Sequence, residues 1–129
     1  MSTHESDSAQ VVIVGAGIAG LTIARQLLNS GISDFSIFDK GRSVGGRVAT
    51  RRIESHRFDH GAQFFTVRDH QFSEIVSPLN VNGQVFEWFK SRPAMQTKTP
   101  SEQIVNYACT GGMNSLAKHM ASVIPGDKI

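Results

Sequence analysis

The sequence predicts an α/β fold that begins with a parallel strand–helix–strand unit. Three stretches predict it: residues 10–14 contain the apolar run VVIV, residues 18–30 repeat apolar side chains at helical spacing, and residues 35–38, FSIF, form a second, mostly apolar strand. A first strand without polar positions is typical of a parallel sheet that is covered on both faces. Two strands and a helix within about thirty residues make a βαβ unit with a right-handed crossover.

The composition is that of one ordinary globular domain. The chain has 129 residues, of which 40% are hydrophobic and 19% are charged, with a formal net charge of +2. Lys and Arg are nearly balanced by Asp and Glu, so we expect no nucleic-acid partner. No apolar run approaches the length of a membrane span, and the histidines lack the spacing of metal ligands, so we expect neither a membrane partner nor a metal. The single cysteine, Cys109, favours a reducing, cytoplasmic location and is expected to be a buried small residue.

Shorter elements are predicted after the βαβ unit. Residues 40–50 are rich in glycine and arginine and are predicted to form a loop. Trp88 and Phe89 are expected to pack in the core of a second sheet. The remaining predictions are short strands at 48–53 and 57–58, a helix over 69–77 that ends before Pro78, a strand at 85–89, a polar linker at 91–100, a strand at 104–108, an amphipathic helix over 113–124, and the start of another strand at 126–129.

A glycine motif, G-x-G-x-x-G, lies between the first predicted strand and its helix. Gly15 permits a tight turn, Gly17 lets a pyrophosphate approach the backbone, and Gly20 lets the helix pack against the strand. The helix N-terminus at Ile18 and Ala19 then offers free N–H groups to phosphates. This arrangement predicts a Rossmann-like dinucleotide site.

A carboxylate follows the second predicted strand at the position where such sites bind a ribose. Asp39 lies about twenty residues after the last glycine, so we expect it to accept hydrogen bonds from an adenosine ribose, with Lys40 beside it. NAD and FAD share these features, so the first motif does not separate the two cofactors.

A second glycine cluster favours FAD. Residues 41–50, GRSVGGRVAT, resemble the G-G-R-x-x-T box that follows the second strand in FAD-dependent amine oxidoreductases. Gly45 and Gly46 would let the backbone pass close to the cofactor, and Arg42 and Arg47 would contact pyrophosphate oxygens.

Two further stretches resemble one family within that group. Residues 57–66, RFDHGAQFFT, are similar to the F-D-H-G-A-Q signature of renalase-like flavoproteins, and residues 112–119, GMNSLAKH, are similar to that family's G-M-N-x-L-A-K-H helix. The resemblance covers nearly all of residues 10–129. It implies non-covalent FAD in a two-domain fold of the amine-oxidase type, with hydride transfer from a dihydronicotinamide dinucleotide to the flavin and reoxidation by molecular oxygen. It places Gly61, Ala62 and Gln63 near the isoalloxazine and the glycine and arginine motifs around the ADP half.

The resemblance also divides the chain. It implies a disordered tail over 1–9, an FAD-binding portion over 10–66, a partial substrate domain over 67–108, and a helix that returns to the first domain over 109–129. Family members are more than twice as long, so the chain is expected to be an N-terminal fragment that is inactive alone and leaves the apolar side of the 113–124 helix partly uncovered. Two alternatives stay open: an NAD(P)-binding reductase, and a non-catalytic nucleotide-binding fragment. The sequence identifies no catalytic residue.

Overall fold

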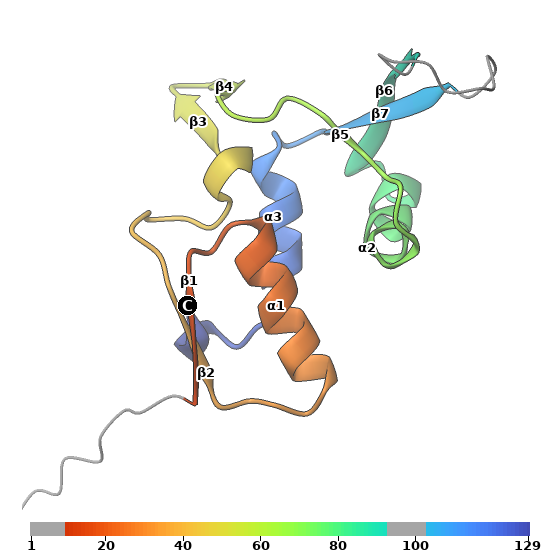
Figure 1. Cartoon of the computed structure of the whole chain (residues 1–129). Coiled ribbons are helices and arrows are strands. Elements are labelled where there is room, and N and C mark those ends of the chain that lie inside the picture. The colour runs from red at the N-terminus through yellow and green to blue at the C-terminus, as the bar shows by residue number, and fades with distance from the viewer. Residues whose placement is uncertain (1–9, 93–102) are drawn as a thin grey trace, which may run out of the picture.

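The computed structural model describes residues 10–92 and 103–129 (Figure 1). The tail over 1–9 and most of the linker predicted at 91–100 lie outside the described residues. Among the described residues, no helix has the length and apolar content needed to cross a bilayer.

The predicted βαβ unit is confirmed. Strands β1 (Val11–Val14) and β2 (Phe35–Phe38) pair in parallel, with Val11 opposite Phe35, and helix α1 (Ile18–Asn29) connects them. The helix lies along one face of the strand pair (Figure 1). It ends where predicted, because Gly31 adopts a φ of 75°, a left-handed conformation that favours glycine.

The loop after β2 ends in a short antiparallel hairpin. A 3-10 turn over Gly46–Val48 leads into β3 (Thr50–Ile53), which pairs with β4 (His56–Asp59). Both strands agree with the predicted ones. The hairpin follows directly from the loop that carries the second glycine cluster, so that the segment from Gly61 onward returns beside that loop.

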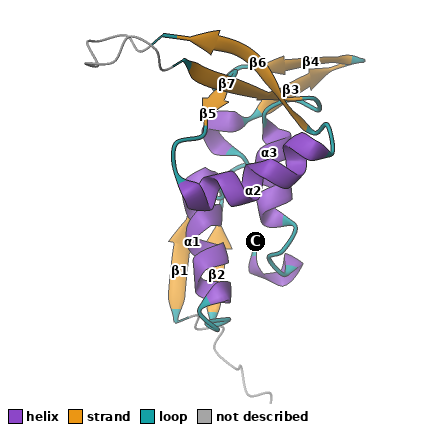
Figure 2. Ribbon diagram, turned by 90° about the vertical axis from the view of Figure 1, so that its right-hand side faces the viewer, coloured by secondary structure: helices purple, strands orange, loops and turns teal. Residues whose placement is uncertain are grey.

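A third sheet, after the β1–β2 pair and the β3–β4 hairpin, has the strand order β5–β7–β6 and lies on helix α2. Its strands are β5 (Phe65–Thr66), β6 (Val85–Ser91) and β7 (Ile104–Cys109), all antiparallel. Helix α2 (His70–Val81) runs beneath this sheet in Figure 2.

The face of this sheet turned away from α2 carries exposed aromatic rings, which we call the aromatic face. Its members are Phe64 (43% exposed), Phe86 (41%), Trp88 (51%) and Phe89 (40%). A β-bulge between Glu87 and Phe89 leaves Trp88 as an extra residue on β6. The expectation that Trp88 and Phe89 pack in the core is therefore wrong for the described residues.

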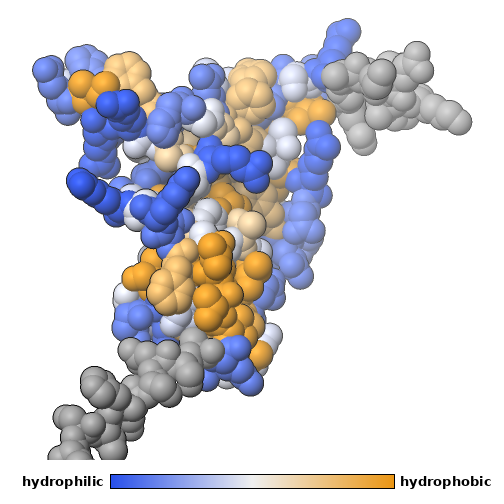
Figure 3. All heavy atoms as spheres, turned by 60° about the vertical axis from the view of Figure 1, so that its left-hand side comes forward, coloured by the Kyte–Doolittle hydropathy of each residue, from blue (hydrophilic) through white to orange (hydrophobic). Residues whose placement is uncertain are grey.

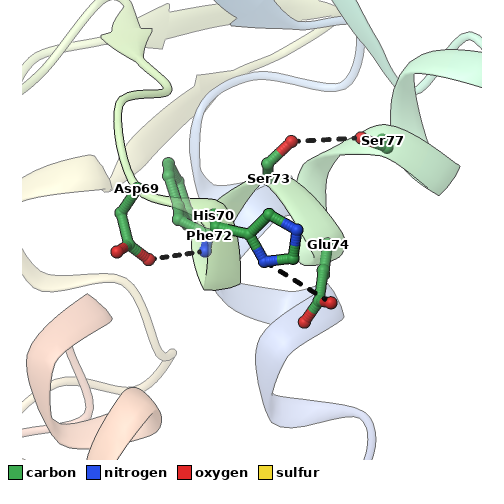
Figure 4. A network of polar contacts seen from close by, with 6 residues as sticks. All are labelled: Asp69, His70, Phe72, Ser73, Glu74 and Ser77. Atoms are coloured by element: carbon green, nitrogen blue, oxygen red, sulfur yellow. Dashed lines mark hydrogen bonds and ion pairs between the residues drawn. The ribbon is translucent and has the colours of Figure 1, made fainter.

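Helix α2 continues through Pro78, so the prediction that it ends before this proline is wrong. Proline removes one N–H donor from the helix. Leu79 beyond it is only 3% exposed, and Asn82 N donates to Pro78 O (3.1 Å), so burial and a terminal hydrogen bond stabilise the last turn. At the other end Asp69 accepts a hydrogen bond from Phe72 N (3.0 Å) and caps the helix, as Figure 4 shows.

The exposed side of α2 carries short polar contacts between residues one turn apart. His70 Nδ1 lies 3.7 Å from Glu74 Oε1, and Ser73 and Ser77 place their hydroxyl oxygens 3.4 Å apart (Figure 4). Both His70 and Glu74 are largely exposed, so this pair contributes little to stability.

Helix α3 (Asn114–Ala121) packs beside α1, and Arg25 Nη1 donates to Met120 O (3.2 Å) between them. Its apolar residues are buried, so the expectation of a partly uncovered apolar helix is wrong: the helix is covered by α1 and the core around it. Buried members of this stripe are Met113, Leu116, Ala117, Met120 and Ile124.

The last residues form a 3-10 turn over Gly126–Lys128, and the predicted start of a strand is wrong. Lys128 N donates to Pro125 O (3.0 Å). A strand needs a neighbouring edge for its backbone hydrogen bonds, whereas a turn satisfies them locally.

One face of the β1–β2 pair is bare. Ile13, Phe35 and Ile37 are buried toward α1, whereas Val14 is 87% exposed and Phe38 is 62% exposed. The bare face is part of the apolar patch in Figure 3. The expectation that both faces are covered is therefore not met by the described residues.

Candidate functional site

The turn after β1 requires glycine at two of its three motif positions. Gly15 has a φ of 101° and donates its N–H to Phe38 O (2.7 Å), so the chain leaves the strand while still bonded to β2. At Gly20 an added Cβ would lie 2.0 Å from Gly15 O. Both glycines therefore serve the turn and the helix packing that the motif predicts.

Gly17 differs from these two, because the protein itself leaves room for a side chain there. Its backbone is extended (φ −80°), and an added Cβ would meet nothing nearer than 3.9 Å. Gly17 is also the N-cap of α1, and no side chain accepts a hydrogen bond there. The N–H groups of the first turn, at Ile18 and Ala19, are therefore available to an anion at the positive end of the helix dipole.

The second glycine cluster is tied to this turn by backbone hydrogen bonds. Gly45 N donates to Ala16 O (2.9 Å), with φ values of 135° at Gly45 and 53° at Gly46. The next segment is tied on in turn, because Ala62 N donates to Arg47 O (2.8 Å). An added Cβ at Gly61 would lie 2.0 Å from Arg47 O, so this close approach requires glycine.

These three segments line one cavity of about 620 Å³ that is open to solvent. Its lining brings together most of the predicted site residues, with Val48 added: Gly17, Ile18, Ala19, Gly45, Gly46, Arg47, Val48, Gly61 and Ala62. Val48 was missed because an apolar residue in a glycine-rich loop carries no chemical signal. The volume is in the range of small-molecule and cofactor sites.

Other predicted residues lie outside the lining. Gly15 and Gly20 shape the turn, as described above. Lys40, Arg42 and Gln63 are exposed and do not line the cavity. Among the described residues, neither Arg42 nor Arg47 forms an ion pair, so the charge of each is free to face an anion.

Asp39 is bound to the glycine turn in this structure. Its Oδ2 accepts from Ala16 N (2.6 Å) and its Oδ1 accepts from Gly41 N (2.6 Å). The hydrogen bond from Ala16, then the one from Gly41, hold the pKa of this carboxyl below its usual range. A carboxylate has about four acceptor positions, so contact with a ribose remains a prediction alongside this structural role.

A polar network beneath the cavity joins three motifs that are distant in the sequence. Asp59 Oδ1 accepts from Thr50 Oγ1 (2.5 Å) and from Met113 N (2.9 Å), and Thr50 Oγ1 accepts from Asn114 N (3.0 Å). Asn114 Nδ2 donates to Val44 O (3.2 Å) in the glycine loop. Asp59 and Thr50 accept the hydrogen bonds of N–H groups at the start of α3 and so cap it, and Asn114 holds the helix against the glycine loop. Thr50, Asp59 and Asn114 each lie in one of the three stretches that resemble flavoprotein motifs, so the sequence could have identified them.

The residues present fit the pyrophosphate of a dinucleotide. Gly17 lines the cavity and an added Cβ there would meet protein atoms only at 3.9 Å, the helix N-terminus is uncapped, and Arg47 brings a positive charge to the lining. No three or more His, Cys, Asp or Glu residues gather as metal ligands within residues 10–92 and 103–129.

Comparison with known proteins agrees with this geometry. The family described as "NAD(P)-binding Rossmann-like domain" matches residues 13–79, more than half of the chain. The chain belongs to this family. The predicted α/β fold with a Rossmann-like unit is thereby confirmed.

Several relatives are oxidases or oxygenases by name, and one is named as FAD-dependent. "Probable polyamine oxidase 5" of Arabidopsis thaliana is 41% identical over 56 residues, which is 42% of this chain and 10% of that protein. "FAD-dependent monooxygenase DEP2" of Fusarium langsethiae is 42% identical over 53 residues, 41% of this chain and 10% of that protein. A solved structure of wild-type putrescine oxidase bound to putrescine superposes with a TM-score of 0.51 at 27% identity, covering 64% of this chain and 18% of that one.

The predicted cofactor, FAD, agrees with these relatives. These similarities support the prediction that the chain resembles FAD-dependent amine oxidases. They do not test the prediction that it resembles renalase-like proteins in particular. The chain spans between 5% and 18% of the length of the curated relatives it matches.

Proposed function

We propose that this chain is the FAD-binding portion of a renalase-like oxidoreductase. The observation that carries the proposal is the cavity in which the uncapped start of α1, the Gly45–Arg47 loop and the Gly61–Ala62 segment meet. The renalase-like assignment rests on the stretches at 57–66 and 112–119. The N–H groups of Ile18 and Ala19 would bind the pyrophosphate at the positive end of the helix.

The residues of this chain bind and orient the cofactor. The Arg47 guanidinium would pair with a phosphate, while Asp39, which fixes the glycine turn through Ala16, would accept hydrogen bonds from the ribose. Gly61 and Ala62 would lie toward the isoalloxazine. The chemistry that FAD supplies when bound is acceptance of a hydride from a dihydronicotinamide dinucleotide or an amine-type substrate, with reoxidation by molecular oxygen.

A direct test is to titrate the purified chain with FAD and, separately, with NADH. We expect one FAD per chain, seen as a change in flavin emission, and weaker binding of NADH. Arg47→Ala should weaken FAD binding about tenfold or more, because a charge-assisted hydrogen bond to phosphate is lost. Arg52→Ala, which removes an exposed arginine on β3 outside the cavity, is the matched control and should leave FAD binding unchanged.

The same titration separates the second candidate. An NAD(P)-binding reductase is favoured by the family's description, and it predicts that NADH binds while FAD does not.

The chemistry is tested by anaerobic mixing of the FAD-loaded chain with a dihydronicotinamide or with an amine. Loss of oxidised flavin absorbance identifies the hydride donor. Because the chain is expected to be inactive alone, absence of change with both donors would agree with the alternative of a non-catalytic nucleotide-binding fragment and would leave the FAD site unaffected.

A further inference from the structure

The glycine loop, residues 41–47, receives a hydrogen bond from a side chain far along the chain. Asn114, the first residue of α3, donates through Nδ2 to Val44 O (3.2 Å), and Ser43 Oγ lies 3.4 Å from the same nitrogen. Within residues 10–92 and 103–129, no other side chain from outside the loop donates to it. Asn114 is only 8% exposed, so water competes little for this donor.

The glycine loop contacts α3 as well as the first turn of α1 (Figure 1). A Cβ added at Gly45 would lie 3.8 Å from the Cβ of Ala117, which is one turn beyond Asn114 on the same side of α3. A Cβ added at Gly46 would lie 3.4 Å from the Cα of Gly17, which lines the cavity. The loop therefore joins α3 to the start of α1.

Two kinds of hydrogen bond fix the loop in this position. The bond donated by Gly45 N joins two backbone groups, so it does not depend on any side chain. The bond from Asn114 can be removed by a substitution, and it acts on Val44, directly before two glycines with φ values of 135° and 53°. Consecutive glycines have a wide choice of backbone conformations, so a Val44 carbonyl without this donor would leave the turn and Arg47 behind it less fixed.

We propose that Asn114 is a positioning residue for the cofactor; this inference rests on the proposed function. Asn114 does not line the cavity, so it acts through the loop. By holding Val44 O it fixes Gly46 and Arg47 in the cavity lining before FAD arrives, which lowers the cost of ordering the loop on binding. By linkage, FAD must stabilise this contact by the same factor by which the contact strengthens FAD binding.

The test compares the FAD dissociation constants of Asn114→Ala and Asn114→Asp with that of the wild type, by flavin emission, from about pH 5 to about pH 8. Asn114→Ala should raise the constant about fivefold relative to the wild type at every pH, because one donor is lost. In Asn114→Asp the ionised carboxylate has no proton to donate and faces Val44 O, so the constant should rise about tenfold or more at the upper pH.

Acid should restore FAD binding in Asn114→Asp alone. The protonated carboxyl has an O–H donor for Val44 O, so at the lower pH the constant should return to within about twofold of the wild type. Burial and the carboxylate of Asp59, which belongs to the same network, both raise the pKa of the introduced carboxyl and bring its protonation into this range. A residue that merely fills space would show no such recovery.

Asn106→Ala is the matched control. Asn106 is 2% exposed and its Nδ2 also donates to a backbone carbonyl, Phe89 O (3.2 Å), and to a serine hydroxyl, Ser91 Oγ (2.9 Å). It lies in β7 and does not line the cavity. Its substitution should lower the free energy of unfolding at least as much as Asn114→Ala does, and it should leave FAD binding unchanged.

Three results would overturn the inference. Equal weakening of FAD binding in Asn114→Ala and Asn106→Ala would mean general loosening of the fold. Failure of Asn114→Asp to recover in acid would exclude the hydrogen bond to Val44 O as the cause, and this comparison also decides the question if Asn114→Ala does not fold. Absence of FAD binding in the wild-type chain would contradict the proposed function and this inference with it, whereas the first two results leave the proposed function intact.

Discussion

The cavity between the two glycine clusters is lined largely by backbone, whereas the aromatic face of the β5–β7–β6 sheet is built from side chains. Gly20 in the turn beside the cavity and Gly61 in its lining allow approaches that no other residue permits, and the lining is held by hydrogen bonds such as Gly45 N to Ala16 O. On the aromatic face, Trp88 and Phe89 stand exposed above a buried Asn106. The contrast implies that an added methyl group at Gly20 or Gly61 destabilises the first region, whereas removal of an exposed ring such as Trp88 leaves the stability of the second nearly unchanged.

The largest expected effect comes from Gly20→Ala in the first region. The new Cβ would lie 2.0 Å from Gly15 O, so backbone must shift, and we expect the free energy of unfolding to fall by about 3 kcal/mol. Urea denaturation measures this. Gly126→Ala is the control, since an added Cβ there meets nothing within 4 Å, and an equal loss in both variants would contradict the role given to Gly20.

A smaller effect is expected from Asp59→Ala, which removes the acceptor for Thr50 Oγ1 and Met113 N. We expect a loss of about 2 kcal/mol and a loosened start of α3. Cys109 supplies the local measurement: burial, and to a smaller extent the charge of Asp59, raises the pKa of its thiol to about 11, so it should react slowly with a thiol reagent near neutral pH and faster in Asp59→Ala. Asp59→Asn removes the same charge and keeps an acceptor oxygen, so faster reaction in Asp59→Ala than in Asp59→Asn reports the loosening of α3. Unchanged reactivity would show that Asp59 does not hold α3.

The contribution of Asp39 should depend on pH. Its pKa in the folded chain is lowered, so it stabilises the fold above its ordinary value of 3.8, and this contribution is lost as pH falls through the lowered value. The difference in unfolding free energy between the wild type and Asp39→Asn should therefore be largest near neutral pH and shrink in acid. A difference that stays constant or grows as the pH falls would contradict a lowered pKa for Asp39 in the folded chain.

The smallest effect is expected in the second region. Trp88→Leu should change the free energy of unfolding by less than about 0.5 kcal/mol, because the ring is 51% exposed. Val85→Ala on the same strand is the contrast, since Val85 is 1% exposed and its truncation should cost about 2 kcal/mol. Equal losses in the two variants would mean that the aromatic face is part of the core.

The same difference explains what the sequence could predict. Backbone conformation restricts the residue type at a position such as Gly15, which accepts only glycine. The turn, the βαβ unit and most of the cavity lining could therefore be predicted from the sequence. The motif that contains Asp59 could be identified from the sequence. Its hydrogen bond from Met113 N could not, because the two residues lie far apart in the chain.

Side-chain surfaces leave no such record. The exposure of Trp88 depends on a bulge that alternation does not reveal, and the bare side of β1 depends on what covers Val14. Likewise, the burial of Leu79 outweighs the proline signal that predicted an earlier end to α2.

The central claim, that the cavity is built for a dinucleotide rather than for the protein's own packing, is tested most directly by Gly17→Ala. Gly17 has an extended backbone, and a Cβ there meets no protein atom nearer than 3.9 Å. FAD titration and urea denaturation of the wild type and this variant give the answer. We expect unchanged or slightly raised stability with FAD binding weakened about tenfold or more. Weakened stability with unchanged FAD binding would contradict the claim.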